Sequence, residues 1–237
     1  MRVRLVDAML VVELGEQRRV LSSAVLGGGL GSARAWFNAT VPGDYSRTDP
    51  TADLAARAAM LELPGPVVGM LTAADVGAHE RASGGAATVF ATVGLGHPLA
   101  ASGTRPRALP GAGTINLLVL VEEALDDAAL VGAAQTAVEA KAQALAAGGV
   151  RAVNARGPAT GTATDALCIA ARPGGGVAFA GPATRVGADI ARAVFTAVHA
   201  GVLRDRAERG ADLPARPATY PDSAFRPSGG TPWTQAG

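Results

Sequence analysis

Apolar runs and helical periodicities divide the chain into strands and helices that do not alternate regularly. Residues 114–121 form the most continuous apolar run, the pattern of a strand buried on both faces. Shorter runs rich in β-branched residues predict further strands. These are 2–23, read as two or three short strands with a turn at 13–17, and then 35–41, 66–71, 87–95 and 166–171.

Two long helices are predicted in the second half of the chain. The first covers about 126–148, with two aspartates at its start and two glycines at its end. The second covers about 186–206, where apolar residues recur at helical spacing. A short Ala-rich helix is expected at 53–63. The fold class is therefore α+β, with a mixed or antiparallel sheet packed against two long helices.

The chain is expected to form one domain followed by a tail. Residues 1–206 carry all the predicted elements, whereas 207–237 are rich in proline and glycine and are expected to be flexible. No 18-residue apolar run predicts a membrane-spanning segment.

Composition narrows the classes of ligand and partner. Twenty-one basic residues against 20 acidic ones give a net charge of +1, which argues against nucleic acid as a partner. The single cysteine, Cys168, lies in an apolar run and predicts a buried residue in a reducing, cytoplasmic protein. His79, His97 and His199 are far apart and show no metal-ligand spacing, so no catalytic metal is expected.

Lys141 is the only lysine in the chain and lies in the first long helix. At 100° per residue, Lys141 and Glu139 point about 200° apart. Glu139 shares its face with two glutamines, whereas Lys141 shares its face with Leu130 and Leu145 and should point inward. An inward lysine must extend to the surface, pair with a carboxylate or give up its charge, and the last two are common in active sites.

A threonine-rich segment precedes the last predicted strand. Thr160, Thr162 and Thr164 alternate with small residues before Asp165, so their hydroxyls would share one face of an extended chain. The segment is either an ordinary strand entry or a row of donors and acceptors lining a site, with Asp165 orienting a proton carrier. Asn116 lies inside an apolar strand and must find partners or cost about 1 to 3 kcal/mol.

The glycine cluster at 27–31 could suggest a phosphate-binding loop. It lacks the Gly-Lys-Ser/Thr ending of a nucleotide loop and the third glycine of a dinucleotide fingerprint. A tight turn or the close approach of a bulky ligand is favoured instead.

Three segments in order resemble the adenosylcobinamide amidohydrolase family, often labelled CbiZ. They are the Gly-Thr-Ile-Asn strand at 113–121, the Glu-Ala-Lys helix at 138–141 and the threonine-rich turn at 159–165. Weaker similarities at 22–24, Asn38 and 68–76 extend the resemblance over about residues 8–204.

Two departures from the family pattern stand out. Ala163 replaces the middle glycine of the threonine-rich turn, and Gly181-Pro182-Ala183-Thr184 stands where a glycine-threonine-histidine-threonine sequence is expected. If that histidine contributes to the chemistry in relatives, its loss at Ala183 would affect activity.

The resemblance implies hydrolysis of the aminopropanol amide of (adenosyl)cobinamide to (adenosyl)cobyric acid, in corrinoid salvage for cobalamin biosynthesis. The cobalt belongs to the substrate, so no cofactor or metal of the protein's own is expected. Lys141 would carry a proton or stabilise the oxyanion, with Asp165 assisting and Glu139 as the alternative that activates water. The expected substrate-binding residues are Asn38, Thr114, Asn116, Thr160, Thr162 and Thr164.

Two other functions remain open. The chain could be a corrinoid-binding protein without hydrolytic activity, or an amidase acting on another bulky amide. A small-molecule corrinoid is the expected partner, and the sequence leaves open whether the chain forms a homo-oligomer.

Overall fold

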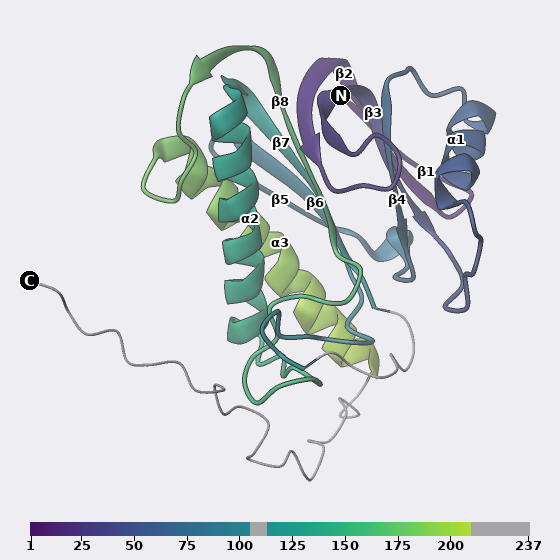
Figure 1. The fold of residues 1–237 in the computed structure, drawn as a ribbon, viewed down its shortest axis with the longest axis vertical. Helices are drawn as coiled ribbons and strands as arrows, with labels where there is room; N and C mark the ends of the chain where they lie inside the picture. The colour runs from purple at the N-terminus through teal and green to yellow at the C-terminus, as the bar shows by residue number, and fades with distance from the viewer. Residues whose placement is uncertain (105–112, 210–237) are drawn as a thin grey trace, which may run out of the picture.

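The computed structural model describes residues 1–104 and 113–209 and contains one mixed β-sheet packed with helices (Figure 1). The sheet order is β4-β3-β2-β8-β7-β6-β5, and β1 pairs with β2 outside this path. The strands are β1 (Arg2–Val6), β2 (Met9–Ser22), β3 (Gly29–Thr40), β4 (Val67–Thr72), β5 (Glu80–Gly84), β6 (Ala87–Val93), β7 (Ile115–Leu125) and β8 (Ala166–Val177). The helices are α1 (Pro50–Met60), the 3₁₀ turn Val76–Ala78, α2 (Asp127–Ala147) and α3 (Arg185–Arg209).

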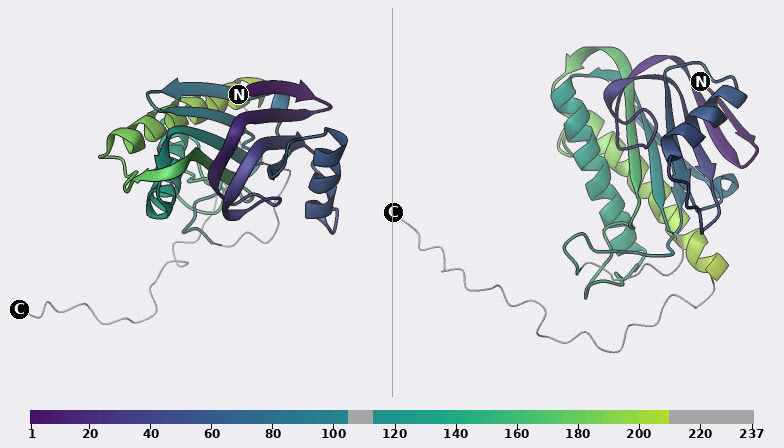
Figure 2. Two further views of the ribbon diagram at one scale, coloured as in Figure 1. Left: turned by 90° about the horizontal axis from the view of Figure 1, so that it is seen from above. Right: turned by 45° about the vertical axis from the view of Figure 1, so that its right-hand side comes forward.

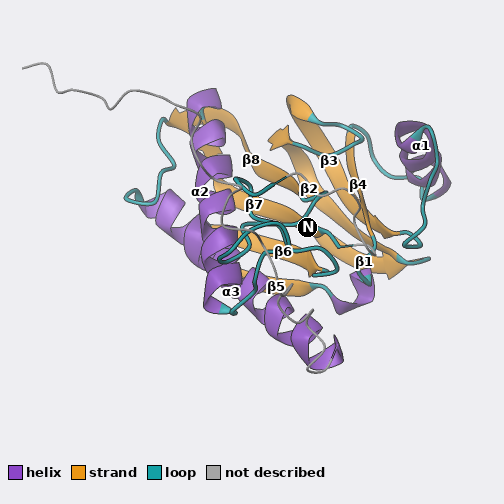
Figure 3. Ribbon diagram, turned by 60° about the horizontal axis from the view of Figure 1, so that its bottom comes forward, coloured by secondary structure: helices purple, strands orange, loops and turns teal. Residues whose placement is uncertain are grey.

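The pairing pattern confirms the predicted α+β class. β3 pairs with β4 and β7 pairs with β8 in parallel, and the other neighbours are antiparallel. The two predicted long helices are present as α2 and α3. They lie side by side over the part of the sheet formed by β5 to β8, while β2, β3 and β4 extend beyond them (Figure 3).

Side chains of alternate residues on β6, β7 and β8 build two cores on opposite faces of the sheet. Val119 and Ile169 pack under α2 and α3, whereas Leu118 and Cys168 point into a second core with Trp36 of β3. A third cluster, around the buried Leu54, attaches α1 to the far end of the sheet, as the additional views show (Figure 2). The sheet is therefore buried on both faces where β7 and β8 pair.

A network of buried amides holds the curled sheet together. The Nδ2 of Asn116 on β7 donates to the Oδ1 of Asn38 on β3 at 2.9 Å and to the carbonyl oxygen of Leu71 on β4 at 2.8 Å. Asn38 donates in turn to the hydroxyl of Thr92 on β6 at 2.9 Å. Because β3 and β4 are not sheet neighbours of β6 and β7, these bonds require the sheet to curl over its second core.

Several predicted boundaries were wrong. Residues 13–17 are not a turn between strands: β2 runs through them with a register shift between Glu13 and Arg18, where Gly15 has φ of +82°. The strand β5 was not predicted, and β7 and β8 extend beyond their apolar runs. The helix α3 continues to Arg209, three residues into the predicted tail, and residues 210–237 lie outside the described part of the chain.

The helix α3 is long and apolar enough to cross a membrane by length and composition alone. Its Ile190, Val194 and Val198 are fully buried in the core under the sheet. This packing is that of a core helix.

The amide network yields a prediction about stability. Replacing Asn116 by leucine should lower the free energy of unfolding by at least about 2 kcal/mol, because Asn38 Oδ1, the Leu71 carbonyl and the Ala166 N–H would lose a buried partner. Urea denaturation followed by circular dichroism measures the change. The exposed Gln143→Leu on α2 serves as control, and equal stability of the two variants would contradict the prediction.

Candidate active site

Lys141 and Asp165 form an ion pair at the C-terminal half of α2. Lys141 points inward from the helix, and its Nζ donates to the Oδ2 of Asp165, which lies directly before β8. The two side chains are 10% and 15% exposed, so the pair is largely buried but still reachable from outside. Of the three outcomes expected for an inward lysine, the structure shows pairing with a carboxylate.

Asp165 is fixed by three further donors. Its Oδ1 accepts from the Ile115 N–H at 3.0 Å and from the Thr162 hydroxyl, and its Oδ2 accepts from the Thr162 N–H at 3.1 Å. A carboxylate has about four lone-pair sites, and these bonds together with Lys141 use four. Asp165 is therefore suited to holding Lys141 in place and poorly suited to taking a proton from water.

Gly161 makes room for this ion pair. A Cβ atom at position 161 would lie 2.4 Å from Asp165 Oδ2 and 2.8 Å from Lys141 Nζ. The Gly161 backbone is itself held by Leu99, whose N–H donates to the Gly161 carbonyl at 2.8 Å. Gly161 was not among the predicted site residues, although it stands between the two first threonines of the 159–165 segment.

The threonines of this segment tie loops together. The Thr164 hydroxyl bonds to that of Thr114 at 2.8 Å, which joins the segment to the start of β7. The Thr160 hydroxyl accepts from the Ala101 N–H at 2.9 Å. Thr162 bonds to Asp165. Thr162 thus contacts Asp165 directly, and all four predicted threonines have a hydrogen bond inside the protein.

Asn154 holds the loop that contacts this segment and was missed by sequence reasoning. Its Oδ1 accepts from Ala100 N–H at 2.8 Å, and its Nδ2 donates to the carbonyls of Ala100 at 3.0 Å and Thr104 at 3.2 Å. It is 5% exposed. The rarity of asparagine in the sequence could have identified this residue. The chain has three asparagines, and all of them, Asn38, Asn116 and Asn154, are buried.

Other predicted residues lie away from the ion pair. Glu139 is on the exposed face of α2. Asn38 and Asn116 have no exposed surface, and the network that they form is connected to the site through the Ala166 N–H, which donates to Asn116 Oδ1 at 3.1 Å. They are therefore placed to hold strands together.

The three histidines occupy separate places. His97 is buried in a loop, and the Nδ1 of His79 lies 2.9 Å from the Val76 carbonyl. His199 stacks on Phe195 along α3, with ring centroids 5.5 Å apart. Within residues 1–104 and 113–209, no group of three His, Cys, Asp or Glu side chains could hold a metal ion.

The departure at Ala183 lies on the other flank of α2. The segment before α3 is attached to α2 through Thr136, whose hydroxyl donates to the Ala180 carbonyl at 2.9 Å. Thr136 and Lys141 are five residues apart, so they point about 140° from each other. The contact that holds this segment therefore lies on a different face of α2 from Lys141.

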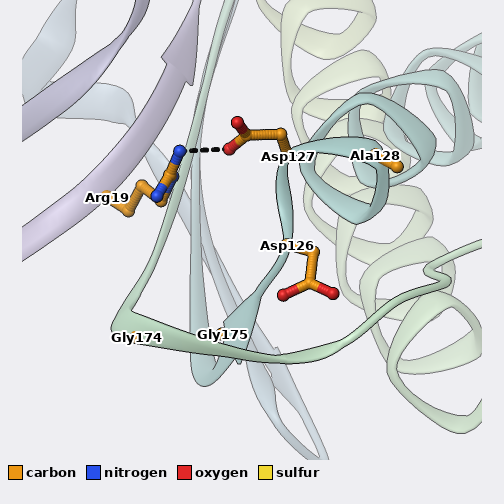
Figure 4. A pocket seen from close by; sticks show the side chains of 6 residues that line it. All are labelled: Arg19, Asp126, Asp127, Ala128, Gly174 and Gly175. Carbon is orange, nitrogen blue, oxygen red and sulfur yellow. Dashed lines mark hydrogen bonds and ion pairs between the residues drawn. The ribbon is translucent and has the colours of Figure 1, made fainter.

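A separate pocket of about 500 Å³ lies at the N-terminal end of α2 (Figure 4). It is lined by Arg19, Asp126, Asp127, Ala128, Gly174 and Gly175. Arg19 and Asp127 form an ion pair beside it. Ala128 precedes Lys141 by thirteen residues, about 20 Å of helix at 1.5 Å per residue, so this pocket is distinct from the ion pair.

Comparisons with known proteins confirm the family that the sequence resembles. A family model described as adenosylcobinamide amidohydrolase matches residues 1–210. The chain is also 36% identical over 226 residues to an adenosylcobinamide amidohydrolase of Halobacterium salinarum, covering 90% of this chain and 87% of the relative. A match of this extent includes every element that positions the ion pair. The chain belongs to the adenosylcobinamide amidohydrolase family.

Proposed function

We propose that the protein is an amidohydrolase that cleaves the aminopropanol amide of adenosylcobinamide and releases adenosylcobyric acid for cobalamin biosynthesis. Family membership over residues 1–210 supports this reaction. The observation that carries the choice of site is the largely buried Lys141–Asp165 ion pair. It joins the helix and the threonine-rich turn of the family pattern, and Asp165 reaches the third segment through Ile115.

Lys141 stabilises the transition state in this proposal. Attack of water on an amide carbonyl places negative charge on the carbonyl oxygen, and a fixed cation or N–H donor lowers the energy of that oxyanion. An ammonium group has three N–H donors, and the bond to Asp165 uses one of them. Lys141 also carries a proton that the departing amine can accept.

Asp165 positions Lys141, and Gly161 allows the two groups to meet. The four hydrogen bonds to the Asp165 carboxylate fix its orientation, and therefore that of Lys141, before the substrate binds. Glu139 would have to act from the exposed face of α2 if it activated the water. The cobalt is part of the substrate, and the proposed mechanism uses no metal held by the protein.

Cys168 does not supply the nucleophile. Burial raises the pKa of its thiol to about 12, and Ser22, which hydrogen-bonds to it, only partly opposes this effect. A thiolate is the reactive form of cysteine, and this pKa keeps it rare at neutral pH. We also propose a cytoplasmic location, which is compatible with the free, buried Cys168.

Incubation of the purified protein with adenosylcobinamide tests the function directly. Mass analysis of the corrinoid should show adenosylcobyric acid, with a chelator present throughout. An unchanged mass together with measurable binding would favour a corrinoid-binding protein without activity. Cleavage of other bulky amides while cobinamide is ignored would favour a different amidase.

Replacing Lys141 by methionine should lower kcat about 10²- to 10³-fold, because the side chain keeps its length but loses the cation at the oxyanion. Gln143→Met, at an exposed position on the same helix, is the control. Circular dichroism of both variants checks folding. Full activity in a folded Lys141→Met protein would remove Lys141 from the mechanism. If Glu139→Gln lowered kcat as much as Lys141→Met, Glu139 would be the group that activates water.

Iodoacetamide at neutral pH should neither label Cys168 in the native protein nor reduce hydrolysis, because the thiol is 1% exposed and protonated. The same reagent should label it fully in about 6 M guanidinium chloride, because unfolding exposes the thiol. Intact-protein mass spectrometry reads both states. Rapid labelling of the native protein would contradict the assignment of Cys168 to the core.

A further inference from the structure

Exposed apolar side chains gather on one side of α2, beside the ion pair. Val131 and Val138 of α2 are 49% and 48% exposed, and Leu30 of β3 is 51% exposed. Leu21 of β2 and Ala134 of α2 are partly buried at the edge of the core under the helices. These five residues are called the apolar surface below.

The strand register places Leu30 on the same face of the sheet as α2. Leu30 is paired with Leu21, which is paired with Ile169 on β8. Ile169 is buried in the core under α2 and α3. Paired residues point to the same face of a sheet, so the face that α2 covers at β8 continues to Leu21 and Leu30, where no helix of the described residues covers it (Figure 3).

Helical geometry turns Val131 and Val138 toward this uncovered part of the sheet. Asp127 of α2 pairs with Arg19, which lies two residues before Leu21 on the same face of β2. Val131 follows Asp127 by about 40° around the helix, and Val138 lies about 20° from Val131. Both valines therefore face β2 and β3.

The apolar surface leads directly to the proposed catalytic group. Lys141 follows Val138 by three residues, about 60° around the helix and one turn further along it. From Val131 to Lys141 the helix rises about 15 Å over ten residues. Near the ion pair, the exposed Ser23 accepts a hydrogen bond from Leu167 N–H at 3.0 Å, two residues after Asp165.

Resting on the function proposed above, we propose that the apolar surface binds the flat, apolar face of the corrin ring and so delivers an amide at its rim to Lys141. None of its five residues is charged, which suits a macrocycle whose faces are apolar and whose amides lie at its edge. Continuity with Lys141 distinguishes this surface from other exposed apolar residues, which are Met60 on α1, Phe179 in the loop after β8 and Leu203 on α3.

The test is steady-state kinetics of two variants that place a charge on the surface, Leu30→Asp and Val138→Asp. Each should raise KM for adenosylcobinamide about tenfold or more, because burying a carboxylate against the ring opposes binding. The kcat value should change little, since binding is lost equally in the ground and transition states. Leu203→Asp, at a 52% exposed position on α3, is the matched control and should leave both constants unchanged.

Sedimentation of the wild type and both variants separates substrate binding from self-association. An unchanged KM in Leu30→Asp and Val138→Asp, with active wild type, would overturn the role of the surface while leaving the proposed function intact. A wild-type dimer that the variants dissociate would assign the surface to a second copy of the chain and also overturn it. Wild-type protein that neither binds nor cleaves adenosylcobinamide would refute the proposed function itself. Thermal unfolding of each variant confirms that it is folded.

Discussion

The pairing of the chain's only lysine with one carboxylate is the interaction on which the site depends. Lys141 lies on the inward face of α2, where an unpaired ammonium group would carry a high desolvation cost. Asp165 offsets that cost, but only because Ile115 and Thr162 hold its carboxylate and Gly161 has no side chain to push the pair apart. Helix, turn and strand are thereby fixed relative to one another at a single point.

A second set of buried polar groups stabilises the same region from the other face of the sheet. Asn116 joins β7 to β3 and β4, and its Oδ1 accepts from the residue that follows Asp165. Buried amides of this kind are costly when unpaired, so they specify one arrangement of the strands. The curl of the sheet and the position of Asp165 are consequently coupled through residues 114–116 and 164–166.

In the proposed mechanism, the rigid groups that support Lys141 are separate from the open surface that binds the substrate. The polar groups around Asp165 are occupied by bonds within the protein, so substrate recognition must rely on groups outside that network. The five residues of the apolar surface beside α2 carry no charge, which suits the macrocycle that we propose it binds. In this proposal, the polar groups around Asp165 position Lys141, and the apolar surface binds the large substrate.

The sequence by itself determined the two long helices, the buried β7, the inward direction of Lys141 and the family. These follow from local periodicity and from motif order, which a linear pattern records directly. It did not determine that β2 passes through residues 13–17, because a bulge and a turn share the same glycine-containing composition. The sequence also did not reveal β5, because this short, polar edge strand lacks an apolar run.

Only the tertiary structure decided which predicted residues meet. Lys141 and Asp165 are 24 residues apart, and Asn38 and Asn116 are 78 apart, so local pattern carries no information on either contact. The structure also gave the threonine hydroxyls bonds inside the protein and left Glu139 exposed, whereas the family resemblance implied that the threonines bind substrate and offered Glu139 as an alternative catalytic group. The physical reason is that sequence spacing fixes the direction of a side chain within its element, while the partner it reaches depends on how the sheet curls and where α2 crosses it.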